Sequence, residues 1–84
     1  MIYTVEKVSK EIQIIDFFYK NDGWFPMDYV KKELKLEILS KILLDEIFQR
    51  LVCKGILDAA IRDSVCIYRI SAFGRYMYSK VVIM

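Results

Sequence analysis

Apolar side chains recur every three or four residues through the first part of the chain, which is the spacing of one face of an α-helix. They are Val5, Val8, Ile12, Ile15, Phe18 and Tyr19, and Ile14 and Phe17 widen the stripe. Thr4 can cap the amino end of such a helix, and Gly23 can end the segment because glycine readily takes a left-handed conformation. The pattern predicts a helix over residues 4–20.

A short aromatic segment follows, and then a second, shorter helical pattern. Pro26 keeps the preceding residue out of the helical region, so residues 24–26 can form only a brief edge strand or a linker. Val30 and Leu34 then lie one helical turn apart, and Asp28 is a suitable cap before them. The pattern predicts a helix at about 28–35.

The third helical pattern is the longest of the central region, at about 39–54, and Gly55 ends it. At 100° per residue, one side of this helix is apolar and should be buried. That side carries Leu44, Ile47, Phe48 and Leu51, and the opposite side carries Ile42, Asp45, Glu46, Gln49 and Cys53. The second set is therefore predicted to face solvent or a partner.

After Gly55 the period of the pattern changes. Two runs rich in β-branched and aromatic residues, with the polar turn Arg62-Asp63-Ser64 between them, predict a β-hairpin over 56–70. Ser71 can then cap a last helix at about 72–82. One side of that helix carries Phe73, Tyr76, Met77, Val81 and Met84.

The order of these elements predicts an α+β fold, mainly helical, in a single domain spanning 1–84. The chain is 84 residues long and 56% hydrophobic, and a domain of this size buries only about 60–65% of the surface that its unfolded chain exposes. Some apolar surface should therefore be left for a second subunit, and we expect a homodimer. The contacts expected on the last helix are Phe73, Tyr76, Met77 and Val81.

Several classes of protein are not expected from these residues. No apolar run approaches the roughly 20 residues needed to cross a bilayer, and the amino end lacks the apolar core of a signal peptide, so we expect no membrane partner and a cytoplasmic location. The chain has no His, and Cys53 and Cys66 lack metal-ligand spacing; we expect two buried thiols and no metal. The glycines are isolated and no serine lies in a G-x-S-x-G context, so we expect no enzymatic activity and no bound cofactor.

Two short stretches resemble a known family. Residues 51–57, Leu-Val-Cys-Lys-Gly-Ile-Leu, resemble the end of a recognition helix that leads into a wing strand. Residues 68–75, Tyr-Arg-Ile-Ser-Ala-Phe-Gly-Arg, resemble the second wing strand and the start of a carboxy-terminal helix, where winged-helix regulators often read Y-x-L-T-x-x-G. The chain departs from the pattern at Ile70, where Leu is more usual, and at 35–38, which lacks the common glycine. The resemblance is to the winged helix-turn-helix family of small prokaryotic and viral transcriptional regulators.

This resemblance implies a three-helix core, a hairpin wing over 56–70 and double-stranded DNA as the partner. In the family the third helix enters the major groove, and a dimer places two such helices about one DNA turn apart. The implied contact residues are Lys31, Lys32, Lys35, Ser40, Lys41, Gln49, Arg50 and Arg62. Residues 1–30 carry three Lys against five acids, whereas residues 31–84 carry ten Lys or Arg against six acids, so the positive excess lies in this half.

A second function remains open beside DNA binding. The exposed side of the third helix carries two carboxylates, which are poorly suited to phosphates, and the net charge of the chain is only +2. Ile42, Asp45 and Glu46 could instead form a docking face for a protein. The fold does not decide between the two, because winged-helix domains serve both roles.

Overall fold

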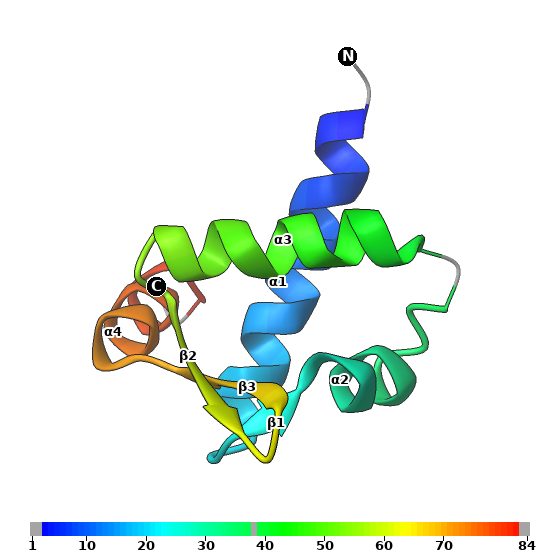
Figure 1. Ribbon diagram of the computed structural model, residues 1–84. Coiled ribbons are helices and arrows are strands. Elements are labelled where there is room, and N and C mark those ends of the chain that lie inside the picture. The colour runs from blue at the N-terminus through cyan, green and yellow to red at the C-terminus, as the bar shows by residue number, and fades with distance from the viewer. Residues whose placement is uncertain (1–2, 38, 83–84) are drawn as a thin grey trace.

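The computed structural model describes residues 3–37 and 39–82, with side chains over 10–37 and 39–80 (Figure 1). Over these residues the chain forms an α+β fold of four helices and a three-stranded antiparallel sheet. In chain order the elements are α1 (Tyr3–Lys20), β1 (Phe25–Pro26), α2 (Met27–Glu33), α3 (Lys41–Cys53), β2 (Leu57–Arg62), β3 (Val65–Ile70) and α4 (Ala72–Val82). The predicted helices and hairpin are all present, with ends shifted by a few residues. The predicted contributions of the Thr4, Val5, Val8, Val81 and Met84 side chains lie outside the described residues.

The sheet has the strand order β1-β3-β2, so the central strand is the last of the three in sequence. Pro26 lies in the edge strand β1, which is one of the two alternatives that the sequence left open for residues 24–26. The hairpin turn is tighter than expected, because Arg62 pairs with Val65 and only Asp63 and Ser64 remain in the loop. Both loop residues have positive φ, 52° and 66°, as in the type I′ turns that suit the twist of a two-stranded ribbon.

The hydrophobic core lies where α3 crosses α1 above the sheet (Figure 1). The predicted buried side of α3 is confirmed, since Leu44, Ile47, Phe48 and Leu51 are all buried. The predicted stripe of α1 is partly wrong. Ile12 is half-exposed, and the buried positions are Glu11, Ile14 and Phe18. The acidic Glu11 takes a core-facing position because it has basic partners on α3, which hydrophobic spacing cannot reveal.

The connection between α2 and α3 has two features that the sequence did not predict. Pro26, not Asp28, precedes the first residue of α2, so the expected Asp28 cap is wrong and this carboxylate lies in the first turn. At the other end Lys35 has φ 55°, and the N–H groups of Lys35 and Leu36 donate to the carbonyls of Lys32 and Lys31. This is the helix-ending motif that glycine usually makes, so here a lysine takes a left-handed conformation.

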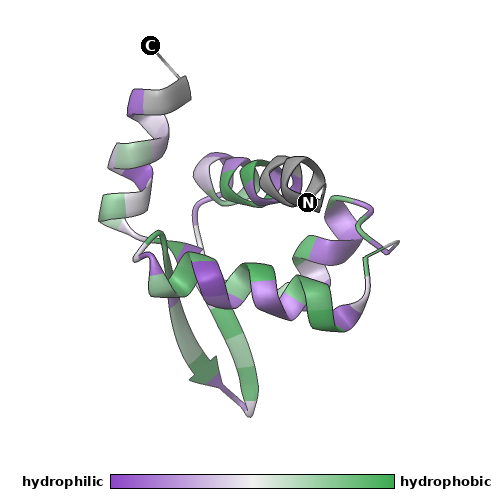
Figure 2. Cartoon of the chain, turned by 90° about the horizontal axis from the view of Figure 1, so that it is seen from above, coloured by the Kyte–Doolittle hydropathy of each residue, from purple (hydrophilic) through white to green (hydrophobic). Residues whose placement is uncertain are grey.

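Seen from above, the β2–β3 hairpin projects beyond α3 on the side away from α1 (Figure 2). Helix α4 leaves the base of the hairpin and runs in the opposite direction, toward α1. The exposed side of α3 and the hairpin thus share one side of the domain, and α4 lies apart from them.

Candidate nucleic-acid interface

The exposed side of α3 carries few positive charges. Ile42, Glu46, Gln49 and Cys53 are exposed there, and Ile42 is 82% exposed. Asp45 lies half-buried on the flank that faces the hairpin. The expectation of two buried thiols is wrong, because Cys53 lies on this outer side and Cys66 lies on the hairpin beyond the core, and both are exposed.

The basic side chains fall into two groups according to their partners. One group forms ion pairs: Lys20 with Asp16, Arg50 and Lys54 with Glu11, Arg69 with Asp58, and Arg75 with Asp22. Among the residues that the structure describes, the basic side chains without an ion pair are Lys10, Lys31, Lys32, Lys35, Lys41, Arg62 and Lys80. All but Lys10 and Lys80 lie on or just after α2, at the start of α3 or at the hairpin turn. Five of these seven side chains thus belong to the segment from α2 to the start of α3 or to the hairpin turn.

Arg50 differs from the other predicted contact residues because an acid from α1 holds it. Its Nη1 donates to Oε2 of Glu11 at 2.9 Å, and Nζ of Lys54 lies 3.9 Å from Oε1 of the same carboxylate. The Glu11 side chain is only 11% exposed, so this pair is screened less by solvent than the others. Glu11 is 39 residues from Arg50 in sequence, and no local pattern indicated this contact.

Ser40 and Lys41 start α3 and have different roles. The hydroxyl of Ser40 accepts a hydrogen bond from the Leu43 N–H at 3.1 Å, which caps the helix. Ser40 was predicted as a contact residue; its side chain is exposed but already used as a cap. Lys41 follows in the first helical turn, and its side chain is exposed.

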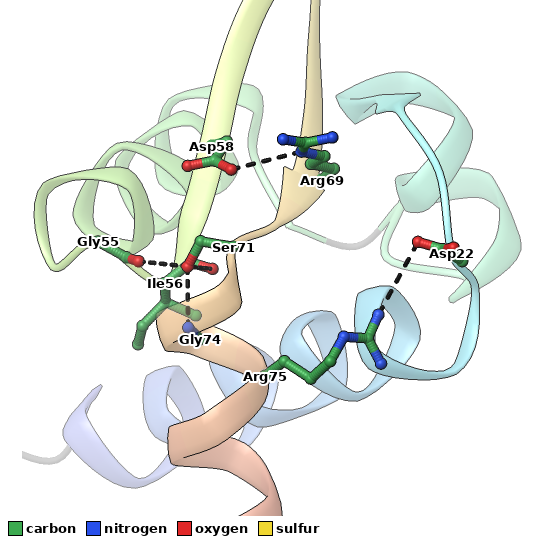
Figure 3. A network of polar contacts seen from close by, with 8 residues as sticks. All are labelled: Asp22, Gly55, Ile56, Asp58, Arg69, Ser71, Gly74 and Arg75. Atoms are coloured by element: carbon green, nitrogen blue, oxygen red, sulfur yellow. Dashed lines mark hydrogen bonds and ion pairs between the residues drawn. The ribbon is translucent and has the colours of Figure 1, made fainter.

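A compact polar network fixes the hairpin relative to α3 and α4 (Figure 3). The Ser71 hydroxyl donates toward the carbonyls of Gly55 at 2.5 Å and Ile56 at 3.0 Å, and it accepts from the Gly74 N–H at 2.8 Å. A Cβ on Gly74 would lie 3.0 Å from Cα and C of Ile56 and closer still to its carbonyl oxygen. These contacts give a physical reason for Ser and Gly at this spacing: one caps α4, and the other lets α4 approach the start of β2.

The hairpin is anchored at its base and apolar toward its turn. At the base, Arg69 Nε donates to Asp58 Oδ2 at 3.4 Å (Figure 3). The guanidinium of Arg69 also lies 4.7 Å from the ring centre of Trp24. Toward the turn, Ile61 is 77% exposed and Val65 is about half-exposed. Figure 2 shows this part of the hairpin mostly in the colours of hydrophobic residues, with a hydrophilic turn. Arg62 is thus a basic side chain beside the polar turn of the hairpin, next to the acidic Asp63.

Helix α4 has one side against α1 and one side toward solvent. The Tyr78 hydroxyl donates to Oδ1 of Asp16 at 2.7 Å, which lowers the pKa of that carboxyl. Burial, followed by this hydrogen bond, raises the pKa of Tyr78 to about 12. On the solvent side the predicted dimer residues Phe73, Tyr76 and Met77 are exposed, by 53%, 56% and 40%.

Three further observations bear on function. No group of residues suited to binding a metal ion is found among the described side chains. Within the described residues, no helix is both long and apolar enough to span a membrane. Comparisons of the chain with protein-family models, with curated proteins and with solved structures find no match.

Proposed function

We propose that this chain is a winged helix-turn-helix protein that binds double-stranded DNA as a homodimer and acts as a transcriptional regulator. The arrangement of the elements supports the proposal. Helix α3 follows α2 after the connecting segment 34–40, the sheet has the order β1-β3-β2, and the β2–β3 hairpin projects beyond α3 (Figures 1 and 2). In this proposal α3 enters the major groove and the hairpin lies along the neighbouring backbone.

The observation that carries the proposal is the placement of the basic side chains that form no ion pair. Acids pair with Lys20 and Arg50 near the carboxyl ends of α1 and α3, with Arg69 at the hairpin base and with Arg75 of α4, whereas the basic side chains of α2, of the start of α3 and of the hairpin turn form no ion pair. We assign the phosphate contacts to Lys31, Lys32, Lys35, Lys41 and Arg62. Arg50 is left out of this set because Glu11 already holds it.

Base recognition requires side chains that reach base edges, and α3 offers two. Gln49 is exposed near the middle of the helix, and its amide can pair with both N6 and N7 of adenine. Ile42 is exposed in the first turns and can contact a thymine methyl group. This pair favours A·T-containing sites.

The dimer places two copies of α3 on one DNA. The exposed side of α4, with Phe73, Tyr76 and Met77, supplies apolar surface for a second copy. Since Tyr78 holds the other side of α4 on α1, this surface cannot turn inward without breaking the contact with Asp16. A sedimentation experiment that finds only monomer at micromolar concentration would remove α4 from this role.

Paired variants test the DNA contacts. Lys31→Ala should weaken binding to all sequences and reduce the slope of log K against log salt by about 1, whereas Gln49→Ala should change sequence preference. Lys20→Ala is the matched control, because Lys20 is paired with Asp16 on α1 and lies outside the proposed surface. Equal effects of Lys31→Ala and Lys20→Ala would contradict the assignment of α2 to the phosphates, and an unchanged preference in Gln49→Ala would exclude that residue from base recognition.

A protein-docking role is the second candidate, and one observation favours it. Ile42 is 82% exposed, and it lies beside Glu46 on the same side of α3, next to the flank that carries Asp45. An apolar centre bordered by carboxylates suits a basic amphipathic segment of a protein. Binding of a protein partner selected against this face should be lost in the Ile42→Glu variant and kept in the Lys31→Ala variant. DNA binding, by contrast, should be weakened by Lys31→Ala.

A further inference from the structure

A hollow of about 400 Å³ lies between the amino ends of α2 and α3 and the free end of the hairpin. Its volume falls in the range of small-molecule sites. Met27 and Asp28 of α2, Lys41 and Asp45 of α3, and Val65 and Tyr68 of β3 contribute to its walls. Residues from α2, α3 and the hairpin thus border one open hollow at the surface.

The charged groups of this hollow leave it with one negative charge. The carboxylates of Asp28 and Asp45 oppose the single ammonium of Lys41. None of the three forms an ion pair with another described residue, so their charges are not cancelled by direct contact. The Asp45 carboxylate acts on the Tyr68 hydroxyl: after burial and the neighbouring Cys66, it helps to raise the pKa of this tyrosine above its usual value.

Beside these charged groups and the polar Ser64, the lining includes apolar side chains that can contact a hydrophobic body. The Met27 side chain, the Val65 side chain and the Tyr68 ring surround the space that the carboxylates border. Tyr68 is buried and packs on Phe48 of the core with ring centres 4.8 Å apart, so this wall is fixed. An apolar wall beside two carboxylates complements a molecule with one cationic end and disfavours an anion.

We propose that this hollow binds a small organic molecule that combines a single ammonium group with an apolar body, such as an arylalkyl amine. The ammonium donates to Asp28 and Asp45, and the apolar body lies against Met27, Val65 and Tyr68. The hollow shares Lys41 with the proposed DNA contacts, but binding of the amine is an additional property that requires no DNA.

The test uses three probes of the same shape and different charge. Calorimetric titration of the whole chain should show binding of phenethylammonium, weaker binding of the neutral phenethyl alcohol, and none of phenylacetate. Because Asp45→Asn replaces a charged hydrogen-bond acceptor by a neutral one, it should weaken phenethylammonium binding by about tenfold or more. Asp22→Asn is the matched control, since Asp22 is an exposed acid outside the hollow, and it should bind as the wild type does.

Amide chemical shifts give a second readout that locates the ligand. Phenethylammonium should shift the resonances of residues around Asp28, Asp45 and Tyr68 in the wild type. Equal binding of the alcohol and the ammonium, equal binding by Asp45→Asn and Asp22→Asn, or shifts centred elsewhere would each overturn the proposal. No DNA is present in this experiment, so its failure is separate from failure of the DNA-binding proposal.

Discussion

Replacing Gly74 with alanine sets two physical effects of opposite sign against each other. Gly74 lies in the first turn of α4, so helix propensity alone predicts that alanine stabilises the protein by up to about 1 kcal/mol. The structure predicts the opposite. The new Cβ would lie 3.0 Å from two backbone atoms of Ile56 and nearer still to its carbonyl oxygen, and backbone atoms cannot rotate away as a side chain can.

The expected loss of stability in Gly74→Ala can be estimated from the displacement of α4 away from Ile56. Overpacking of this kind costs about 1–3 kcal/mol. Moving α4 away from Ile56 also weakens the Ser71 network, in which the helix cap and the hydrogen bond to the Gly55 and Ile56 carbonyls contribute about 1 kcal/mol each. After the propensity gain is subtracted, we expect Gly74→Ala to lower the free energy of unfolding by about 2 kcal/mol. For a domain of this size the melting temperature should fall by about 8–16 °C.

Urea unfolding followed by circular dichroism, with Trp24 fluorescence as a second probe, measures the change. Coincident transitions from the two probes would justify two-state treatment. Ser79→Ala is the control on the same helix, and its effect should stay within about 0.5 kcal/mol, as for most substitutions outside the core. A Gly74→Ala protein that is as stable as the wild type, or more stable, would refute the close approach of α4 to the start of β2.

Three further predictions concern other parts of the fold. Ser71→Ala should lower the free energy of unfolding by about 1–3 kcal/mol, and Ser71→Thr should restore most of it, both measured by urea unfolding; equal stability of the two variants would contradict the role of the hydroxyl. Lys35→Gly should stabilise the protein by about 1 kcal/mol because Lys35 has φ 55°, whereas Lys32→Gly, in the regular helix, should destabilise it by a similar amount. Because the pKa of Tyr78 is raised to about 12, the contribution of Tyr78 to stability is complete below about pH 10 and is lost as the pH rises toward 12. Because the pKa of Asp16 is lowered, the contribution of Asp16 is present above about pH 4 and is lost below that pH. Melting temperatures of wild type and Tyr78→Phe should therefore converge in both windows, and a constant difference across them would contradict the Tyr78–Asp16 hydrogen bond.

Local patterns predicted most of the architecture. The 3.6-residue period of α3 identified its buried side, because the four buried residues of α3 all face the hydrophobic core. The change to β-rich segments after Gly55 identified the hairpin, and the spacing of Ser71 and Gly74 marked the start of α4. In each case the information lies within one element or its immediate neighbours.

Contacts between distant elements were the part that could not be predicted. Glu11 faces the core because Arg50 and Lys54 meet it there, and Tyr78 reaches Asp16 across 62 positions. The candidate basic residues could be named from the sequence. Which of these residues form ion pairs with acids depends on the packing of α1, α3 and α4. For the same reason the hollow between α2, α3 and the hairpin had no counterpart in the sequence pattern.

The left-handed Lys35 illustrates a different limit. The absence of glycine at 35–38 is visible in the sequence as a departure from the winged-helix pattern. The turn is nevertheless made, with the Leu36 N–H donating to the Lys31 carbonyl at 2.8 Å and Leu36 buried in the core. Burial of Leu36 offsets the conformational cost at Lys35, and propensity alone cannot show that balance.

Titration of the wild-type chain with random double-stranded DNA, at low and at moderate salt, tests the central claim most directly. We expect micromolar affinity that falls steeply with salt, and five phosphate contacts per protomer would give a slope of log K against log salt of about −4.5 for each protomer. No binding at low salt would contradict the DNA-binding proposal and would favour a protein partner on the side of α3 that carries Ile42, Asp45 and Glu46.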